Sequence, residues 1–356
     1  VESPEGDETR QWGPPFDSRG RSAYYLSVNR NKRSLTLNLK SDAGREIARE
    51  LAKQSQIVVE NFKPGGAAAF GLGYDDLHAL NPALVYASIT GFGQTGPYSE
   101  RPGYDFIVQA MSGLMSITGE TGGAPSKVGV AIADVIAGMF AATSILAALR
   151  HAERTGTGQH LDISLLDSQI AALVNVASGA LVSGTTPARY GNAHPSIVPY
   201  QTFRASDAEF ALGVGNDRQF AQLCQLIERP TWADDPRFAT NPARVQNRQE
   251  LVDLLGEVFI TRPAAEWVER ALERGIPAGS LNTISQILDD PHIQARGLIH
   301  EIDSLRLVGP PIGFSQTPPT VRTPPPDLGE HTDAILREQL GMSDAEIEAH
   351  RVNGVI

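Results

Sequence analysis

The segment from Gly156 to Asp167 constrains the fold of this chain more than any other. It begins with a glycine-rich turn, continues as a short strand-like stretch over 160–164, and leads into apolar residues at helical spacing. A turn, a strand and a helix in that order are typical of an α/β protein. Asp167 lies in the first turn of the predicted helix, three residues after Ser164.

Two interpretations of Asp167 remain open on the residues alone. The positive end of a helix dipole stabilises a charged carboxylate, and such a carboxylate suits a nucleophile. The pattern Ser-x-x-Asp before an apolar run also approximates a capping box, in which the side chains only satisfy backbone donors. The same geometry can serve both roles.

The first 155 residues alternate strand-like and helix-like segments, which predicts a parallel sheet covered by helices. The helix over 134–154 is rich in Ala, Leu and Ile, so we expect it to be buried, and Gly156 ends it. Strands are predicted over 34–39, 57–59 and 84–89, and the other helices over 42–52, capped by Ser41 or Asp42, and 104–114.

The alternation of strand-like and helix-like segments ends at about Gly191. An extended stretch over 195–203 and a strand over 210–214 precede helices over 217–227, 248–259 and 264–274. A proline-rich connector over 310–326 leads to a helix near 332–340. The sequence therefore predicts a large Rossmann-like α/β domain over 1–190, a smaller α+β domain over 191–305, and a connector with a C-terminal segment over 306–356.

Composition excludes several classes of protein. A net charge of −11 leaves no basic excess for nucleic acid, and we expect no apolar run long enough to span a membrane. Cys224, the only cysteine, lies in a helical pattern and is expected in the core of a protein from a reducing compartment. That predicts the cytoplasm, or the mitochondrial matrix in a eukaryote. The start at Val1 suggests that upstream residues, with any targeting signal, are missing.

Two sequence patterns argue against a dinucleotide-binding site and a metal site. Residues 91–96 match G-x-G-x-x-G after a strand, but Pro97 and the polar residues after it do not form an amphipathic helix. We interpret them as a glycine-rich loop at a strand end, a place that often faces a ligand. The eight histidines lack a metal-binding spacing, so no metal site is predicted. His194 lies in a polar turn, where a surface role and a site role are both open.

Segments with ligand-binding potential follow other strands. Asn61 and Phe62 come directly after the strand over 57–59, and an aromatic ring there can stack on an adenine. Lys40 follows the strand over 34–39 and can meet a phosphate. Each of these residues is also compatible with ordinary loop structure.

Together these segments resemble the class III CoA-transferases, the family that includes formyl-CoA transferase and α-methylacyl-CoA racemase. The resemblance covers essentially the whole chain, and within the family it is strongest to the succinyl-CoA:glutarate type, through residues 10–16, 25–30 and 193–201. The stretches that carry the family resemblance are 28–34, 59–65, 88–97, 156–159 and 328–332.

The resemblance implies a CoA-transferase that moves CoA from a donor, succinyl-CoA, to a dicarboxylic acid such as glutarate. Asp167 would be the nucleophile, and a CoA thioester would be a substrate, with no tightly bound cofactor. Arg30 and His194 would hold the second carboxylate of the acid. The positions implied for CoA contact are Leu37, Lys40, Asn61, Phe62, Tyr104 and Asp105.

The resemblance also implies an interlocked homodimer of ring-like chains, with the C-terminal segment returning to the large CoA-binding domain. Formyl-CoA transferase has arginines where this chain has Ser3 and Ala69, so nucleotide anchoring differs. The rival racemase branch needs a His where Tyr104 stands, although its partner position is occupied by Asp134. A phenol is a poor base near neutral pH. A catalytically silent CoA-binding protein is the alternative from another class.

Overall fold

The computed structural model describes all residues from 1 to 356, and packing divides them into two units. The first unit comprises residues 1–112, 130–174 and 288–356, and the second comprises residues 113–129 and 175–287. The predicted boundaries at residues 190 and 305 do not coincide with these divisions, and the domain assignment stays a prediction. The two units are described separately.

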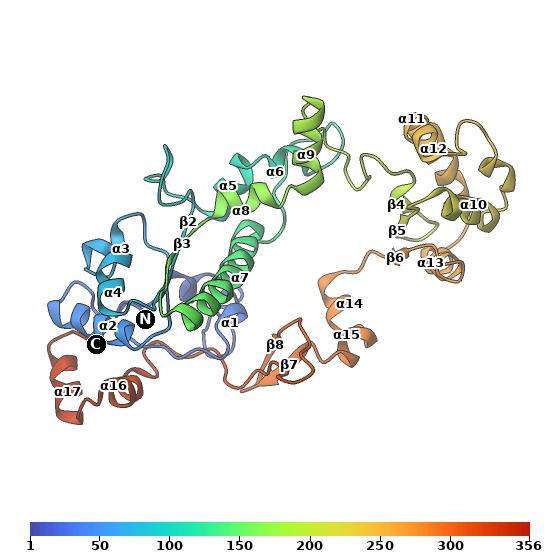
Figure 1. Ribbon diagram of the computed structural model, residues 1–356. Helices are drawn as coiled ribbons and strands as arrows, with labels where there is room; N and C mark the ends of the chain where they lie inside the picture. Colours follow the sequence, from blue (N-terminus) through green and yellow to red (C-terminus); the bar gives the residue numbers. More distant parts are fainter. The chain divides into compact units, whose positions relative to one another are not determined.

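The first unit contains the predicted parallel sheet, which confirms the α/β class (Figure 1). Strands β1 (Ile57–Glu60), β2 (Val85–Thr90) and β3 (His160–Ser164) pair in that order, both pairs in parallel. Val58 lies opposite Tyr86, and Ile89 lies opposite Ile163. The central strand β2 is almost wholly buried, as expected for a strand covered on both faces.

Helix α7 (Ile132–Thr155) crosses from β2 to β3 and ends at Gly156, whose φ of 73° only glycine adopts readily. It packs against β2, β3 and the next helix through a strip of small side chains, while large apolar side chains stay exposed. The strip is Ala133, Ala137, Ala141, Ala148 and Ala152. The exposed side chains include Val135, Met139, Phe140 and Leu146.

Two expectations about this helix are wrong. Only 22% of its most apolar 18-residue window is buried, because alanines alone face the sheet. The mean hydropathy of 2.0 in that window also makes α7 long and apolar enough to cross a membrane by length and composition, contrary to the expectation that no run reaches that length. A helix that covers another protein surface passes the same test.

The remaining elements of the first unit surround this sheet and helix. Ser41 caps α2 by accepting the Gly44 N–H, as its sequence predicts. These elements are the 3₁₀ helix η1 (Glu8–Gln11), α1 (Ala23–Val28), α2 (Asp42–Lys53), α3 (Gly66–Ala69), α4 (Tyr74–Leu80), α5 (Asp105–Met111), α8 (Leu165–Ala171), α15 (Pro291–Ala295), β7 (Ile299–Ile302), β8 (Leu305–Val308), α16 (Thr332–Leu340) and α17 (Asp344–Val352).

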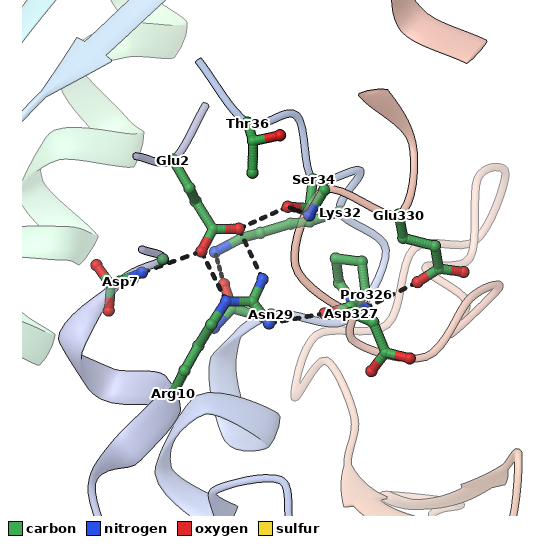
Figure 2. Close-up of polar contacts among 12 residues, drawn as sticks. Glu2, Asp7, Arg10, Asn29, Lys32, Ser34, Thr36, Pro326, Asp327 and Glu330 are labelled. Carbon is green, nitrogen blue, oxygen red and sulfur yellow. Dashed lines mark hydrogen bonds and ion pairs between the residues drawn. The ribbon is translucent and has the colours of Figure 1, made fainter. Parts of the chain in front are cut away.

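The two ends of the chain meet in the first unit. Leu35, Leu37 and Ile47 share a core cluster with Leu336 and Ile347. A polar network beside this cluster joins the same segments, with Arg10 bonded to Glu2 and to the carbonyl of Pro326 (Figure 2). The connector is tied down by Asn31, whose side chain bonds to Thr320, Arg322 and Thr323.

Two predicted elements differ in the structure. The strand over 34–39 is reduced to an isolated bridge between Glu2 and Thr36, because the segment that pairs with it turns away at Pro4 and Glu5. The helix over 104–114 is broken at Gly113, whose φ is 90°, so that α5 and α6 (Leu114–Ile117) are separate helices. Neither change affects the class of fold.

The second unit has its own core, which includes Cys224, fully buried as predicted. Burial raises the pKa of the Cys224 thiol to about 12. An antiparallel sheet β4-β5-β6 is covered by the predicted helices. The further elements are α9 (Val174–Ser183), β4 (Tyr200–Arg204), β5 (Glu209–Gly213), α10 (Asp217–Leu226), η2 (Pro230–Ala233), α11 (Asn241–Gln246), α12 (Arg248–Phe259), α13 (Ala264–Leu272), β6 (Ala278–Ser280) and α14 (Ile284–Leu288).

Candidate active site

Three candidate segments follow the carboxyl ends of adjacent parallel strands. Asn61 and Phe62 follow β1, the glycine-rich loop over 91–96 follows β2, and α8 follows β3. Because the strands are parallel, these segments emerge at one edge of the sheet. Ligands of open α/β sheets bind at that edge.

Asp167 stands at this edge in the first turn of α8. The hydroxyl of Ser164 accepts the Asp167 N–H at 3.1 Å and so provides the helix cap. The Asp167 carboxylate is exposed and has neither a hydrogen bond nor an ion pair within the chain. The serine half of the capping box is therefore present, and the carboxylate remains available for another role.

The glycine-rich loop is a loop, as the sequence predicts, and it packs against the start of α8. The Leu166 N–H donates to the carbonyl of Gly91 at 3.1 Å. The carboxylate of Asp162 accepts the Gln94 N–H at 3.0 Å. Gly91 also lies so close to Gly103 that a side chain at either position would clash with the other's backbone.

Asp134 is a second carboxylate in the first turn of a helix, at the start of α7. Since α7 returns the chain from the end of β2 to the start of β3, its N-terminus lies toward the carboxyl edge of the sheet. Partial burial, which removes water from the charged form, raises the pKa of the Asp134 carboxyl, and the negative charge of Asp105 raises it further. The side chain nevertheless remains open to solvent.

Asp105 connects α5 to the start of α7. Its carboxylate accepts the Ala133 N–H at 2.8 Å and the Gln109 side-chain amide at 2.7 Å. Burial raises the pKa of the Tyr24 phenol, and the charges of Asp134 and Asp105 raise it further, so Tyr24 lies within electrostatic range of both. Tyr104, which precedes α5, exposes 64% of its surface.

The predicted nucleotide contacts differ in how they present their side chains. Lys40 and Asn61 are exposed, and Phe62 contacts Phe70 edge to face with 5.9 Å between ring centroids. Leu37 exposes only 1% of its surface and packs in the core, so its side chain faces away from solvent. Its backbone N–H donates to the carbonyl of Glu2 at 2.9 Å.

The two predicted carboxylate holders belong to different units. Arg30, in the first unit, bonds through Nη1 to the carbonyl of Ser27 at 3.0 Å. His194, in the second unit, accepts the Ser196 N–H on Nδ1 at 3.0 Å and donates its own backbone N–H to Tyr200. Neither pairs with a carboxylate in the chain.

Sequence reasoning missed Asp134 as a candidate nucleophile and noted it only as the partner position of the racemase branch. The signal was an acidic residue in the first turn of the longest helix. The structure adds its proximity to Asp105, which no periodicity reveals. No group of three or more His, Cys, Asp and Glu side chains is arranged to hold a metal ion.

The family model for CoA-transferase family III matches residues 1–332. This chain belongs to CoA-transferase family III. It is 46% identical over 349 residues to a succinate–glutarate CoA-transferase of Agrobacterium fabrum, covering 95% of this chain and 87% of the relative. It is 41% identical over 362 residues to a human succinyl-CoA:glutarate CoA-transferase, covering 100% and 82%.

A solved structure agrees with this family assignment. The CAIB/BAIF family protein of Brucella suis superposes with a TM-score of 0.85 at 45% identity, covering 95% of this chain and 90% of that chain. The chain is therefore a CoA-transferase, and CoA thioesters are its substrates.

Proposed function

We propose that this enzyme transfers CoA from succinyl-CoA to glutarate. Relatives with that named activity are 41–46% identical over nearly the whole chain, and this supports the assignment most strongly. The exposed Lys40, Asn61 and Phe62 suit the nucleotide of CoA. The donor, the acceptor and these contacts remain parts of the proposal.

The reaction proceeds through covalent intermediates on an aspartate. The carboxylate attacks the succinyl thioester and forms a mixed anhydride, releasing CoA thiolate. The thiolate then attacks the aspartyl carbonyl, which releases succinate and leaves an enzyme–CoA thioester. Glutarate attacks this thioester, and the returning thiolate takes the glutaryl group and frees the aspartate. Each step is an acyl transfer with a good leaving group.

Two aspartates compete for the nucleophile. The sequence resemblance proposes Asp167, whose exposed carboxylate lies at the start of a seven-residue helix. The geometry supports Asp134 better, because it lies in the first turn of a 24-residue helix and Asp105 bonds to the N–H of its neighbour Ala133. The charge of Asp105 also raises the pKa of Asp134. A partly dehydrated carboxylate that remains accessible is a stronger nucleophile than a fully hydrated one. We therefore assign the nucleophile to Asp134 and keep Asp167 as the alternative.

The acceptor site is proposed to hold the second carboxylate of glutarate. Arg30 and His194 are the candidates from the sequence, and neither is neutralised by a carboxylate of its own chain. Arginine favours two-pronged binding of a carboxylate. A holder of this kind distinguishes dicarboxylic acids from fatty acids.

The active form is proposed to be an interlocked homodimer located in the cytoplasm, or in the matrix of a mitochondrion. Support for the dimer comes from the exposed apolar side chains of α5, α7 and α8 in the first unit, which a second copy would cover. They include Phe106, Ile107, Met139, Leu146 and Ile170.

The test of the proposed function is an assay with purified protein, succinyl-CoA and glutarate. Mass spectrometry should detect glutaryl-CoA and free succinate in equal amounts. Formation of neither product, while a chiral 2-methylacyl-CoA loses its optical purity, would replace the transferase assignment with the racemase. No reaction with any acyl-CoA would favour the silent CoA-binding protein.

A further inference from the structure

Helix α7 begins without a capping side chain of its own. Its N-cap residue is Ala131, whose side chain cannot accept a hydrogen bond. Ala133 in the first turn is fully buried, so water cannot satisfy its N–H. Asp105 of α5 accepts that N–H at 2.8 Å and so caps the helix from a neighbouring element. Because Asp134 lies in the same turn, this cap helps to place the proposed nucleophile.

The covalent connection between α5 and α7 passes through the other unit. Residues 113–129 belong to the second unit, and the chain returns to the first unit at Val130. The side chain of Gln109 in α5 bonds across this break. Its amide nitrogen donates to the Asp105 carboxylate at 2.7 Å and to the carbonyl of Val130 at 3.2 Å. The first bond holds the cap, and the second holds the segment that enters α7.

The amide of Gln109 is present for these bonds rather than for packing. Gln109 is fully buried, and a buried amide is unfavourable unless it is hydrogen-bonded. An apolar side chain would fill the same space without that requirement. Since a carboxylate and a carbonyl can only accept, the nitrogen and not the oxygen of the amide must face them. The orientation of the side chain is therefore fixed.

We propose that Gln109 is a positioning residue for CoA transfer, because it holds Asp105 and Val130 and through them the first turn of α7. The inference rests on the proposed function, in which Asp134 attacks the succinyl thioester. Because Gln109 is fully buried, it acts through this turn and not on the substrate. Attack needs the carboxylate in line with the thioester carbon, and a displacement of about 1 Å can lower a rate about 100-fold.

The test is a single turnover with succinyl-CoA in the absence of an acceptor acid. Formation of the enzyme–CoA thioester releases one succinate for each active site. The amplitude of succinate release counts the correctly folded sites, the rate constant at saturation reports the covalent step, and the half-saturating concentration reports binding. Gln109→Met keeps the length of the side chain and removes both hydrogen bonds. It should keep the amplitude and the half-saturating concentration but lower the rate constant about 10- to 100-fold.

Gln169→Met is the matched control. Gln169 lies in α8 of the same unit, exposes only 2% of its surface, and has an Oε1 without a hydrogen-bond partner. The same replacement there removes a buried amide and leaves the cap of α7 intact. Its rate constant should stay within about twofold of the wild type.

Gln109→Glu gives a second, independent measurement through the pH profile. Its side chain keeps the length and the polar end, and it donates to Asp105 only while it is protonated, because adjoining carboxylates disfavour each other's charge. The rate constant of this variant should fall as pH rises between about 6 and 9. The other titratable groups near α5 are Asp134 on α7, Asp167 on α8, and Tyr24 on α1, whose pKa is raised above its ordinary value of 10. These groups are the same in the wild type, which should lack the alkaline fall.

Three results would overturn the inference. The first is a rate constant in Gln109→Met within twofold of the wild type, or an equal loss in Gln169→Met. The second is an unaltered pH profile in Gln109→Glu. The third is a lost amplitude in both Gln109 variants, because the residue would then only support the fold. If the wild-type protein releases no succinate from succinyl-CoA, the proposed function itself fails, so the two failures are distinguishable.

Discussion

Asp134 and Asp105 show how two neighbouring carboxylates take different roles. Asp105 accepts the Ala133 N–H at the start of α7 with one oxygen and the Gln109 side-chain amide of α5 with the other. Asp134 makes no hydrogen bond, and the charge of Asp105 raises its pKa. The first therefore acts as a positioning residue and the second as the candidate nucleophile.

Asp105→Asn tests this relation through the pH profile. Asparagine can still accept the Ala133 N–H, but it removes the negative charge that helps to raise the pKa of Asp134. A carboxylate nucleophile acts only when ionised, so activity falls as pH drops through its pKa. The acid limb of kcat/KM should move to lower pH in the variant, and an unmoved limb would contradict the assignment of Asp134.

Glu2 provides a stability prediction. Burial disfavours its charge, but hydrogen bonds from Arg10 and Ser34 outweigh that effect and hold the pKa of Glu2 at about 2, against an ordinary value of 4.5 (Figure 2). Its folded pKa is depressed, so the stabilisation is complete above pH 4.5 and is lost as pH falls toward 2.

Glu2→Gln should lower the free energy of unfolding by about 2 kcal/mol at pH 7 and flatten its decline between pH 4.5 and 2. Urea unfolding at several pH values measures both effects. Glu8→Gln, which changes an exposed carboxylate on the next turn of chain, is the control and should leave the curve within about 0.5 kcal/mol. Equal curves for the two variants would refute the role of the network.

At the scale of elements, the strand β3 with its flanking turn and helix holds the site together. Gly158 lies against the backbone of the loop before β2, and an added Cβ would come within 1.9 Å of the carbonyl oxygen of Leu84. Gly156 has a positive φ but open space around it. The two glycines of one turn are therefore required for different reasons.

Alanine substitutions separate these reasons. Gly158→Ala should destabilise the protein by about 2–3 kcal/mol, because backbone must move to admit the methyl group. Gly156→Ala should cost only about 1 kcal/mol, the strain of a left-handed alanine. Urea unfolding measures both, and a Gly158→Ala protein no less stable than Gly156→Ala would disprove the close approach.

Local patterns made much of the fold predictable. The cap at Ser41, the end of α7 at Gly156 and the strands β1 and β2 follow from residues close in sequence, and the structure confirms them. The hairpin β7–β8 was missed, although Asp303 and Ser304 form its two-residue turn with positive φ. The burial of α7 was overestimated, because an apolar composition does not reveal which face of a helix packs against a neighbour.

The candidate site was predictable only where it follows strands. Asn61, Phe62 and the loop over 91–96 could be placed at one edge because parallel strands end together. The proximity of Asp105 to Asp134 depends on a tertiary contact between distant segments, the bond from the Ala133 N–H to Asp105. Such contacts leave no periodic signal in the sequence.

At the scale of the whole molecule, the exposed apolar face of α7 needs a cover. Met139 and Leu146 each expose 67% of their surface, which is unfavourable in water. The proposed homodimer supplies a second copy as that cover. It also explains how a helix that is apolar enough for a membrane can belong to an enzyme of water-soluble substrates.

Met139→Glu should therefore dissociate the dimer or leave it at least tenfold weaker, whereas Arg150→Glu, on an exposed polar position of the same helix, should not. Mass photometry without detergent measures the fraction of dimer. A wild-type protein that is monomeric and active, or that stays in solution only with detergent, would contradict the homodimer.

The nucleophile is tested most directly by mapping the covalent intermediate. The protein is incubated with succinyl-CoA, the enzyme–CoA thioester is reduced with borohydride, and the digested peptides are sequenced by mass spectrometry. Asp134→Asn and Asp167→Asn proteins are treated in parallel. We expect the reduced residue at position 134 in the wild type and in Asp167→Asn, and no reduced aspartate in Asp134→Asn. Reduction at position 167, or a fully active Asp134→Asn enzyme, would contradict the assignment.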